Sequence, residues 1–287
     1  MSGSGLSDDG PDVATSRHGA MPRDLLLVRH GRSEGNVATE SAKTGDHRFV
    51  EDPLFRERST MHYRLVAEGR EQAAAAGEWI RSWMAAEGVD RFDRYSCSPY
   101  VRTMETAALL DLPGAEWRRE SLLRERDFGA WEGLGRDRIS ELFEHEAAYK
   151  TRNRYLYRPT GGESLGDVEL RVREVLASLA REMEGRRVLC VAHEDVIWAF
   201  RYRLEKMTIR EYLAEHDAGA EIPNGGVVHF TRVRPDGTLD DRFHRVRTVT
   251  PGADADPPWR TIERPTDTNE DLLAEVAEYE CLWGGDA

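Results

Sequence analysis

LLLVRHGRSEGN, the stretch from Leu25 to Asn36, joins a continuous apolar run to a polar turn that contains glycine. A short apolar run of this kind is typical of a strand buried on both faces in an α/β protein. Arg29 and His30 come where this strand should end, and ligands of open α/β sheets bind outside the carboxyl ends of the strands. A helix beginning near Ser33 would direct free backbone N–H groups to the same place, which suits an anion. We therefore expect a phosphate-binding turn, with Arg29 as a bidentate cation and His30 as nucleophile or base.

A second segment places another arginine beside a strand end. Residues 92–97 read as a strand, and Ser98 and Pro99 follow it. Ser98 suits an N-cap and Pro99 the first helical position, so we expect a helix that runs to about Leu110. Arg102 then lies in the first turn of this helix, above the edge of the sheet.

Two further segments complete a set of catalytic side chains. His193 follows an apolar run, residues 187–192, that reads as a buried strand. Glu125 lies among charged residues just before the aromatic and glycine-rich residues 128–133. Two arginines, two histidines and a glutamate at strand ends are what phosphoryl transfer through a covalent histidine requires. For Glu125 a solvated ion-pair face remains an alternative.

The rest of the chain alternates helices and strands in the manner of an α/β protein. We expect helices over residues 66–87, 137–150, 164–184 and 196–204, and strands over residues 187–192, 227–232 and 242–249. Ser164 with Asp167 resembles a capping box at the start of the third helix. Residues 1–23 have no periodicity and are expected to form a flexible leader.

The tail, residues 251–287, changes character after a Pro257-Pro258 pair. Residues 268–283 predict an amphipathic helix whose apolar stripe consists of Leu272, Val276, Tyr279 and Trp283. We expect the stripe to dock on the catalytic body, with a homodimer contact as the alternative.

The charge, the apolar stretches and the cysteines of the chain limit which partners, location and metals we expect. The net charge of −13 argues against a nucleic-acid or anionic-membrane partner. No apolar stretch is long enough to span a membrane, and no signal-peptide pattern is found, so a cytoplasmic location is expected. The three cysteines make no disulfide framework, and no second ligand pair stands at zinc-site spacing from His193. We therefore expect a small phosphorylated substrate, with no metal and no cofactor.

These segments resemble the histidine phosphatase superfamily, which contains the cofactor-dependent phosphoglycerate mutases. The matching motifs, in the family order, are Arg29-His30-Gly31, Ser98-Pro99-Tyr100-Val101-Arg102, Glu125 with residues 128–133, Gly161-Gly162-Glu163-Ser164, and His193. The resemblance covers roughly residues 24 to 248. It implies a phosphoglycerate mutase-like three-layer α/β sandwich, with a mostly parallel central sheet flanked by helices, in a domain of residues 24–250.

A mechanism follows from the chemistry of these groups. The neutral imidazole of His30 attacks phosphorus and forms a phosphohistidine. Arg29, Arg102 and His193 surround the nonbridging oxygens, and Glu125 protonates the leaving alkoxide and then deprotonates the attacking water. Hydrophobic neighbours would raise the pKa of Glu125 and the arginines would lower it, so the sequence leaves its protonation state open.

Side chains that bind the rest of the substrate are harder to assign. Asn36 and Ser33 lie in the first turn, and Glu194 stands where the family commonly has glycine. Glu194 and its neighbour Asp195 would most simply cap a helix N-terminus, although Glu194 could instead contact a cationic or hydroxyl-bearing part of a substrate.

Two basic segments, residues 43–64 and 149–158, are expected near the mouth of the site. Arg152 and Arg154 lie in the second of them. They indicate a substrate with more than one anionic group, unless these charges pair with the abundant carboxylates.

The sequence predicts a metal-independent phosphomonoesterase acting on a small phosphorylated metabolite. The alternatives are a phosphoglycerate-type mutase, and a regulatory or scaffold relative without catalysis. Residues 128–133 look more like the phosphatase members of the family than the true mutases, and the complete catalytic set argues against loss of catalysis.

Overall fold

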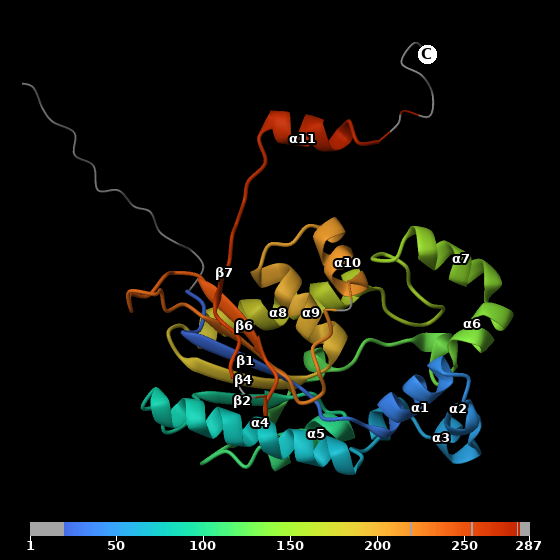
Figure 1. Ribbon diagram of the computed structural model, residues 1–287, viewed down its shortest axis with the longest axis horizontal. Helices are drawn as coiled ribbons and strands as arrows, with labels where there is room; N and C mark the ends of the chain where they lie inside the picture. The colour runs from blue at the N-terminus through green and yellow to red at the C-terminus, as the bar shows by residue number, and fades with distance from the viewer. Residues whose placement is uncertain (1–19, 219, 254, 280, 282–287) are drawn as a thin grey trace, which may run out of the picture.

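A seven-stranded sheet in the order β3-β2-β4-β1-β5-β6-β7 forms the centre of the computed structural model, which describes residues 20–218, 220–253, 255–279 and 281 (Figure 1). Strands β1, β2, β3 and β4 are mutually parallel, whereas β5 is antiparallel to β1, β6 to β5 and β7 to β6. The sheet is therefore mostly but not purely parallel. The strands are β1 (Asp24–Arg29), β2 (Arg94–Cys97), β3 (Trp117–Arg119), β4 (Arg187–Ala192), β5 (Val227–Thr231), β6 (Arg245–Val249) and β7 (Arg260–Thr261).

Both faces of the central strands are covered by helices, which explains their continuous apolar sequences. Leu25 and Leu27 of β1 face α8 (Leu165–Glu182) and α9 (Glu194–Leu204). Leu26 and Val28 face the opposite way, toward α4 (Ala67–Ala86) and α5 (Val101–Leu109). All four side chains are fully buried, and burying each contributes about 1.5–3 kcal/mol to stability. The result is the expected three-layer α/β sandwich, with α8 and α9 on one side of the sheet and α4 and α5 on the other (Figure 1).

The turn after β1 is held close to the start of α4. A Cβ added to Gly31 would lie 2.1 Å from the carbonyl oxygen of Gly69, and one added to Gly69 would lie 2.0 Å from that of Arg32. Such separations are far inside van der Waals contact, so only glycine fits at either position. This close approach fixes the backbone that follows His30.

Short helices gather at the end of the sheet where β1 leads into α1, as Figure 1 shows. They are α1 (Glu34–Lys43), α2 (Arg48–Glu51), α3 (Pro53–Glu57), α6 (Arg136–Leu142) and α7 (Glu144–Arg152), with the 3-10 helices η1 (Thr60–His62), η2 (Ser121–Leu123) and η3 (Gly129–Trp131) nearby in sequence. The remaining helices are α10 (Ile209–Asp217) and α11 (Asn269–Val276).

Two helix predictions are wrong in detail. The helix expected from Ser98 begins two residues beyond Pro99, at Val101, and Tyr100 is its N-cap. The helix expected over residues 137–150 is broken at Phe143, whose backbone (φ −133°, ψ 44°) is non-helical. The ring of Phe143 lies 6.4 Å from that of Trp131, so a tertiary contact accompanies the break. The capping box at Ser164 and Asp167 is present.

The tail departs from its predicted packing. Helix α11 stands away from the sheet and helices of the body in Figure 1. Leu272, Val276 and Tyr279 are 50%, 64% and 66% exposed, so the prediction that the stripe docks on the body is wrong for these three residues. An ion pair between Arg210 of α10 and Glu278 joins this region to the body. The extended chain before α11 accounts for the separation, and Trp283 and the predicted leader up to residue 19 lie outside the described residues.

In the described part of the chain, no helix is both long and apolar enough to cross a membrane.

Candidate active site

His30 lies directly beyond β1 and is almost fully buried. Its Nδ1 is 2.8 Å from the carbonyl oxygen of Gly31, which accepts a hydrogen bond only if Nδ1 carries the proton. Nε2 then keeps its lone pair, and the Nε–H of Arg102 donates to it at 3.2 Å. Burial, and then the charges of Arg102 and Arg29, hold the pKa of His30 well below its usual value. The imidazole is therefore neutral, as a nucleophile must be.

Arg102 projects from the first turn of α5 and is held by groups on several sides. Its Nη1 donates to the carbonyl oxygen of Thr60 at 2.7 Å, and its Nη2 is 3.7 Å from Glu125 Oε2. The guanidinium also lies over the ring of Tyr100, 4.9 Å from its centroid. These contacts fix a cation beside His30.

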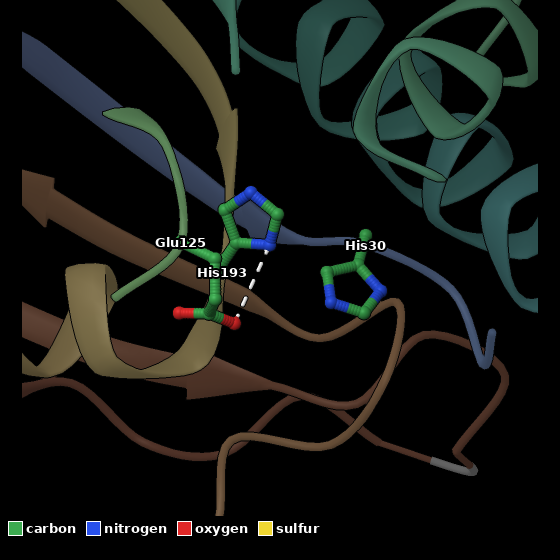
Figure 2. Close-up of side chains that lie close together, drawn as sticks. All are labelled: His30, Glu125 and His193. Carbon is green, nitrogen blue, oxygen red and sulfur yellow. Dashed lines mark ion pairs between the residues drawn. The ribbon is translucent and has the colours of Figure 1, made fainter. Parts of the chain in front are cut away.

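His193 follows β4 and is fully buried against His30, with the two ring centroids 5.2 Å apart. Its Nε2 is 2.9 Å from Ser98 Oγ, so the serine expected to cap α5 instead orients this imidazole. Burial, and then Arg102 and His30, hold the pKa of His193 well below its usual value. Its Nδ1 makes no hydrogen bond within the described residues and lies 3.5 Å from Glu125 Oε2, as Figure 2 shows.

Glu125 lies in the loop after η2, and its carboxylate faces the two histidines (Figure 2). Its side chain is 19% exposed, which is too little for the alternative of a solvated ion-pair face. Burial, and then the charge of Asp195, raise the pKa of Glu125 to about 7, although Arg102 opposes the shift. A carboxyl with such a pKa can both give and take a proton near neutral pH.

Glu163 was not predicted as a site residue, and it holds the loop that carries Glu125. Its carboxylate accepts from Arg124 Nη2 at 2.5 Å, from Arg171 Nε at 3.1 Å and from the backbone N–H of Asp127 at 3.1 Å. The Gly-Gly-Glu-Ser match was the signal in the sequence, but it carried no information on these partners.

Arg29 is engaged by two acceptors. Its Nη1 donates to the carbonyl oxygen of Ile222, and its Nη2 lies 2.8 Å from Glu194 Oε2. Glu194 is the first residue of α9, but His193 is the N-cap and no side chain bonds the cap. The expectation that Glu194 simply caps this helix is therefore incomplete, because its carboxylate is held by Arg29. Burial raises the pKa of Glu194, and Arg29 opposes that shift.

Ser33 and Asn36 form the capping box of α1. Ser33 Oγ accepts from the N–H of Asn36, and Asn36 Oδ1 accepts from the N–H of Ser33 at 3.0 Å. Both residues line the same cavity as His30. A residue missed from the sequence, Asn224, lines it too and donates from Nδ2 to the carbonyl oxygen of His30 at 3.0 Å.

The site opens into a cavity of about 1460 Å³. Its lining includes the aromatic residues Phe55 and Phe128 and, from α1 and α7 and the loop after α7, the cations Lys43, Lys150, Arg152 and Arg154. Lys43 and Arg152 form no ion pair or hydrogen bond through their charged ends with any described residue. The structure thus brings Arg152 and Arg154 into one cavity with four of the five predicted catalytic residues, Arg29, His30, Arg102 and Glu125. The fifth, His193, is fully buried and does not line this cavity.

His30, Glu125 and His193 also offer ligand atoms that all lie within 4.8 Å of one another, a combination found in metal sites. Two guanidinium groups lie beside these ligand atoms. Arg102 Nε is 3.2 Å from His30 Nε2, and Arg29 lines the same cavity. Like charges repel strongly at such separations. The electrostatics therefore favour a phosphate anion over a cation.

The sequence is similar to those of known proteins. Residues 25–222 match the model of the histidine phosphatase superfamily, branch 1. The 2,3-bisphosphoglycerate-dependent phosphoglycerate mutase of Methylorubrum populi is 32% identical over 228 residues, which cover 77% of this chain and 95% of that one. The corresponding mutase of Methylobacterium radiotolerans is 35% identical over 194 residues, covering 66% and 82%.

Solved structures give a similar fold. The mycobacterial glucosyl-3-phosphoglycerate phosphatase superposes with a TM-score of 0.55 at 28% identity, covering 72% of this chain and 89% of that one. The alpha-ribazole phosphatase of Shigella flexneri superposes with a TM-score of 0.55 at 22% identity, covering 76% and 94%. From its matched motifs, its fold and these relatives, the chain belongs to the histidine phosphatase superfamily and is an enzyme of the phosphatase or mutase kind.

Proposed function

We propose that the protein is a metal-independent phosphomonoesterase that forms a phosphohistidine on His30. The observation that carries the proposal is the lone pair of His30 Nε2 in a buried site with two arginines, next to a carboxyl group whose pKa is about 7. The arginines supply the positive charge that a transferring phosphoryl group needs. Glu125 supplies the proton.

The reaction has two chemical steps. In the first, His30 Nε2 forms a bond to phosphorus, the ester P–O bond breaks, and Glu125 gives its proton to the leaving oxygen. In the second, Glu125 takes a proton from water, the water oxygen bonds phosphorus, and the N–P bond breaks to release inorganic phosphate. Arg29, Arg102 and His193 hold the nonbridging oxygens in both steps.

Hydrolysis and mutase chemistry differ only in what accepts the phosphoryl group. The names of the Methylorubrum and Methylobacterium relatives favour the mutase, whereas the mycobacterial glucosyl-3-phosphoglycerate phosphatase favours hydrolysis. A cavity of about 1460 Å³ has room for water beside a small metabolite, since one water occupies about 30 Å³ of liquid. We favour hydrolysis because residues 128–133 look more like the phosphatase members of the family than the true mutases.

The test compares wild type with His30→Ala in the presence of a chelator, using phosphate release from a panel of phosphomonoesters. We expect chelator-resistant release that falls by more than about a hundredfold in the variant, because the covalent nucleophile is lost. His145→Ala, an exposed change on α7, is the matched control. Residual turnover of His30→Ala above about a hundredth of wild type would contradict the scheme.

The same panel separates the two activities. A mutase would transfer label from a phosphorylated donor to a second hydroxyl and would release little inorganic phosphate. Wild type that releases none, yet takes up label on His30, would favour the mutase. Silence in both assays would favour a relative without catalysis.

We also propose that the substrate carries a second anionic group, bound at the mouth by Arg152 and Arg154. Both line the cavity, and Arg152 is exposed there. Replacing both with alanine should raise KM for a bisphosphate about tenfold and leave KM for a monophosphate within about threefold, because the two exposed charge contacts together contribute about 1.4 kcal/mol. Steady-state kinetics on paired substrates test this, and equal effects would contradict it.

A further inference from the structure

Glu194 neutralises part of the positive charge at the proposed phosphate site. Arg29 is paired with Glu194 at 2.8 Å, Arg102 lies 3.7 Å from Glu125, and Arg126 lies 3.7 Å from Asp195. Each guanidinium around the nucleophile therefore has a carboxylate of its own.

The ion pair between Arg29 and Glu194 is the shortest of the three. Arg29 is 9% exposed, and its Nη1 and Nη2 are both engaged, by the carbonyl oxygen of Ile222 and by Glu194. The Glu194 side chain is 26% exposed. Its place as the first residue of α9, directly after His193, points it at the same end of the sheet. The Glu194 carboxylate thus pairs with the Arg29 guanidinium, which a phosphate oxygen would otherwise contact.

Resting on the proposed function, we propose that Glu194 is a specificity-determining residue: its carboxylate competes with phosphate for Arg29 and so selects substrates that carry a second anionic group. A single phosphate group must share Arg29 with Glu194 or displace it, and two anions this close repel each other. The binding of inorganic phosphate and of simple monoesters is thereby weakened.

A second anionic group restores the lost affinity at the mouth of the cavity. Lys43 and Arg152 line the same cavity as Arg29 and have no ion-pair partner among the described residues. An ester with a second phosphate or carboxylate gains their attraction, whereas the product phosphate does not. Glu194 therefore also limits inhibition by the product.

The experiment measures binding of inorganic phosphate by calorimetric titration, and turnover of a monoester and a bisphosphate, for wild type and Glu194→Gln. We expect Glu194→Gln to bind phosphate about tenfold more tightly, because one unit of like charge is removed beside the anion. We also expect it to raise kcat/KM for the monoester more than for the bisphosphate. Glu194→Gly, the residue that family members commonly have, should act in the same direction.

Glu221→Gln is the matched control, since Glu221 lines the same cavity but forms no ion pair with Arg29 in the described structure. We expect it to change phosphate affinity less than threefold. Unchanged phosphate binding in both Glu194 variants, or an equal gain in Glu221→Gln, would overturn the proposal. Wild type that binds phosphate but hydrolyses no ester would contradict the proposed hydrolysis, while the phosphate titration would still decide the role of Glu194.

Discussion

At the scale of residues, the site is governed by burial. His30 and His193 keep neutral rings because each is buried beside Arg102, and Glu125 is pushed toward protonation because burial outweighs the nearby arginine. The identities of these residues were predictable from the motifs around them. The partners of Arg29 were not, because Ile222 lies 193 positions away in the sequence and only the tertiary fold brings it there.

Glu125 should give the enzyme a characteristic pH dependence. Its pKa of about 7 means that the carboxyl holds its proton below this pH and loses it above. The first step needs the protonated form, so kcat/KM for alkyl phosphate esters, which reports the free enzyme, should fall about tenfold per pH unit above pH 7. Rates measured from pH 5 to 9 test this, and a flat profile up to pH 9 would contradict the role of Glu125 as the acid.

Glu125→Gln provides the companion measurement. It cannot donate the proton, so turnover of alkyl esters should fall by about 10²–10⁴-fold. Aryl esters with good leaving groups should lose less, because their leaving oxygen needs no proton. Because Glu125 also activates water in the second step for every ester, the comparison uses the pre-steady-state burst of released alcohol or phenol. Equal losses of burst rate for both ester classes would indicate a positioning role instead.

A second buried charge, at the other end of β1, governs stability. Asp24 is 4% exposed, and its Oδ1 is 3.3 Å from His229 Nε2 and its Oδ2 is 3.2 Å from Arg187 Nε. Burial raises the pKa of Asp24, but its contacts with His229, Thr231 and Arg187 together lower the pKa by more than burial raises it. The pKa in the folded protein therefore lies below the unfolded value. The stabilisation is therefore present above about pH 4 and is lost as the pH falls through the folded pKa.

Asp24→Asn should lower the free energy of unfolding by about 2 kcal/mol at pH 7, since buried partners lose a charged acceptor. The difference from wild type should shrink as the pH falls below about 4. Urea denaturation at a series of pH values measures both. A constant difference across that range would show that the effect is not electrostatic.

At the scale of elements, the accuracy of prediction depended on how local the determinants were. Helices α4 and α8 and strand β4 begin and end within two residues of the predicted bounds, because their apolar periodicity and caps lie within the segment. The break at Phe143 coincides with a contact to the ring of Trp131, and the late start of α5 coincides with a hydrogen bond between Ser98 and His193. A helical pattern alone cannot report such contacts.

The packing of α4 on the chain after α5 depends on Gly77. A Cβ added there would lie 2.2 Å from the carbonyl oxygen of Leu110. Helix propensity alone predicts that Gly77→Ala stabilises the protein by up to about 1 kcal/mol. We expect the opposite sign, a destabilisation of about 1–3 kcal/mol, because the backbone must move apart. Thermal and urea unfolding decide the sign, and a stabilised variant would contradict the close packing.

At the scale of the whole molecule, the segment after β6 divides into a packed strap, residues 250–253 and 255–264, and the exposed helix α11. In the strap, Trp79 Nε1 donates to Asp256 Oδ1 at 2.7 Å, and the ring of Trp259 lies 4.8 Å from that of His229 and 4.4 Å from the guanidinium of Arg247. Helix α11, by contrast, exposes its apolar side chains. The strap therefore belongs to the body, whereas α11 contributes little packing to it.

Truncation after Arg264 should leave the melting temperature within about 2 °C of wild type and leave esterase turnover unchanged, because few apolar groups are buried by α11. Trp259→Ala should instead lower stability by about 3 kcal/mol, since a large packed aromatic is lost. Differential scanning calorimetry compares the two. Light scattering on the truncated chain tests the homodimer alternative, which predicts a change from dimer to monomer.

The two edge strands of the sheet, β3 and β7, have a consequence for solubility. The strands there are short: β3 spans three residues, of which Arg118 and Arg119 are exposed, and β7 spans two, including the exposed Arg260. Unpaired strand borders invite pairing with another chain, and short length and positive side chains discourage it. Concentrated samples should therefore resist growth of intermolecular β-structure, and replacing Arg118 and Arg119 with valine should promote it.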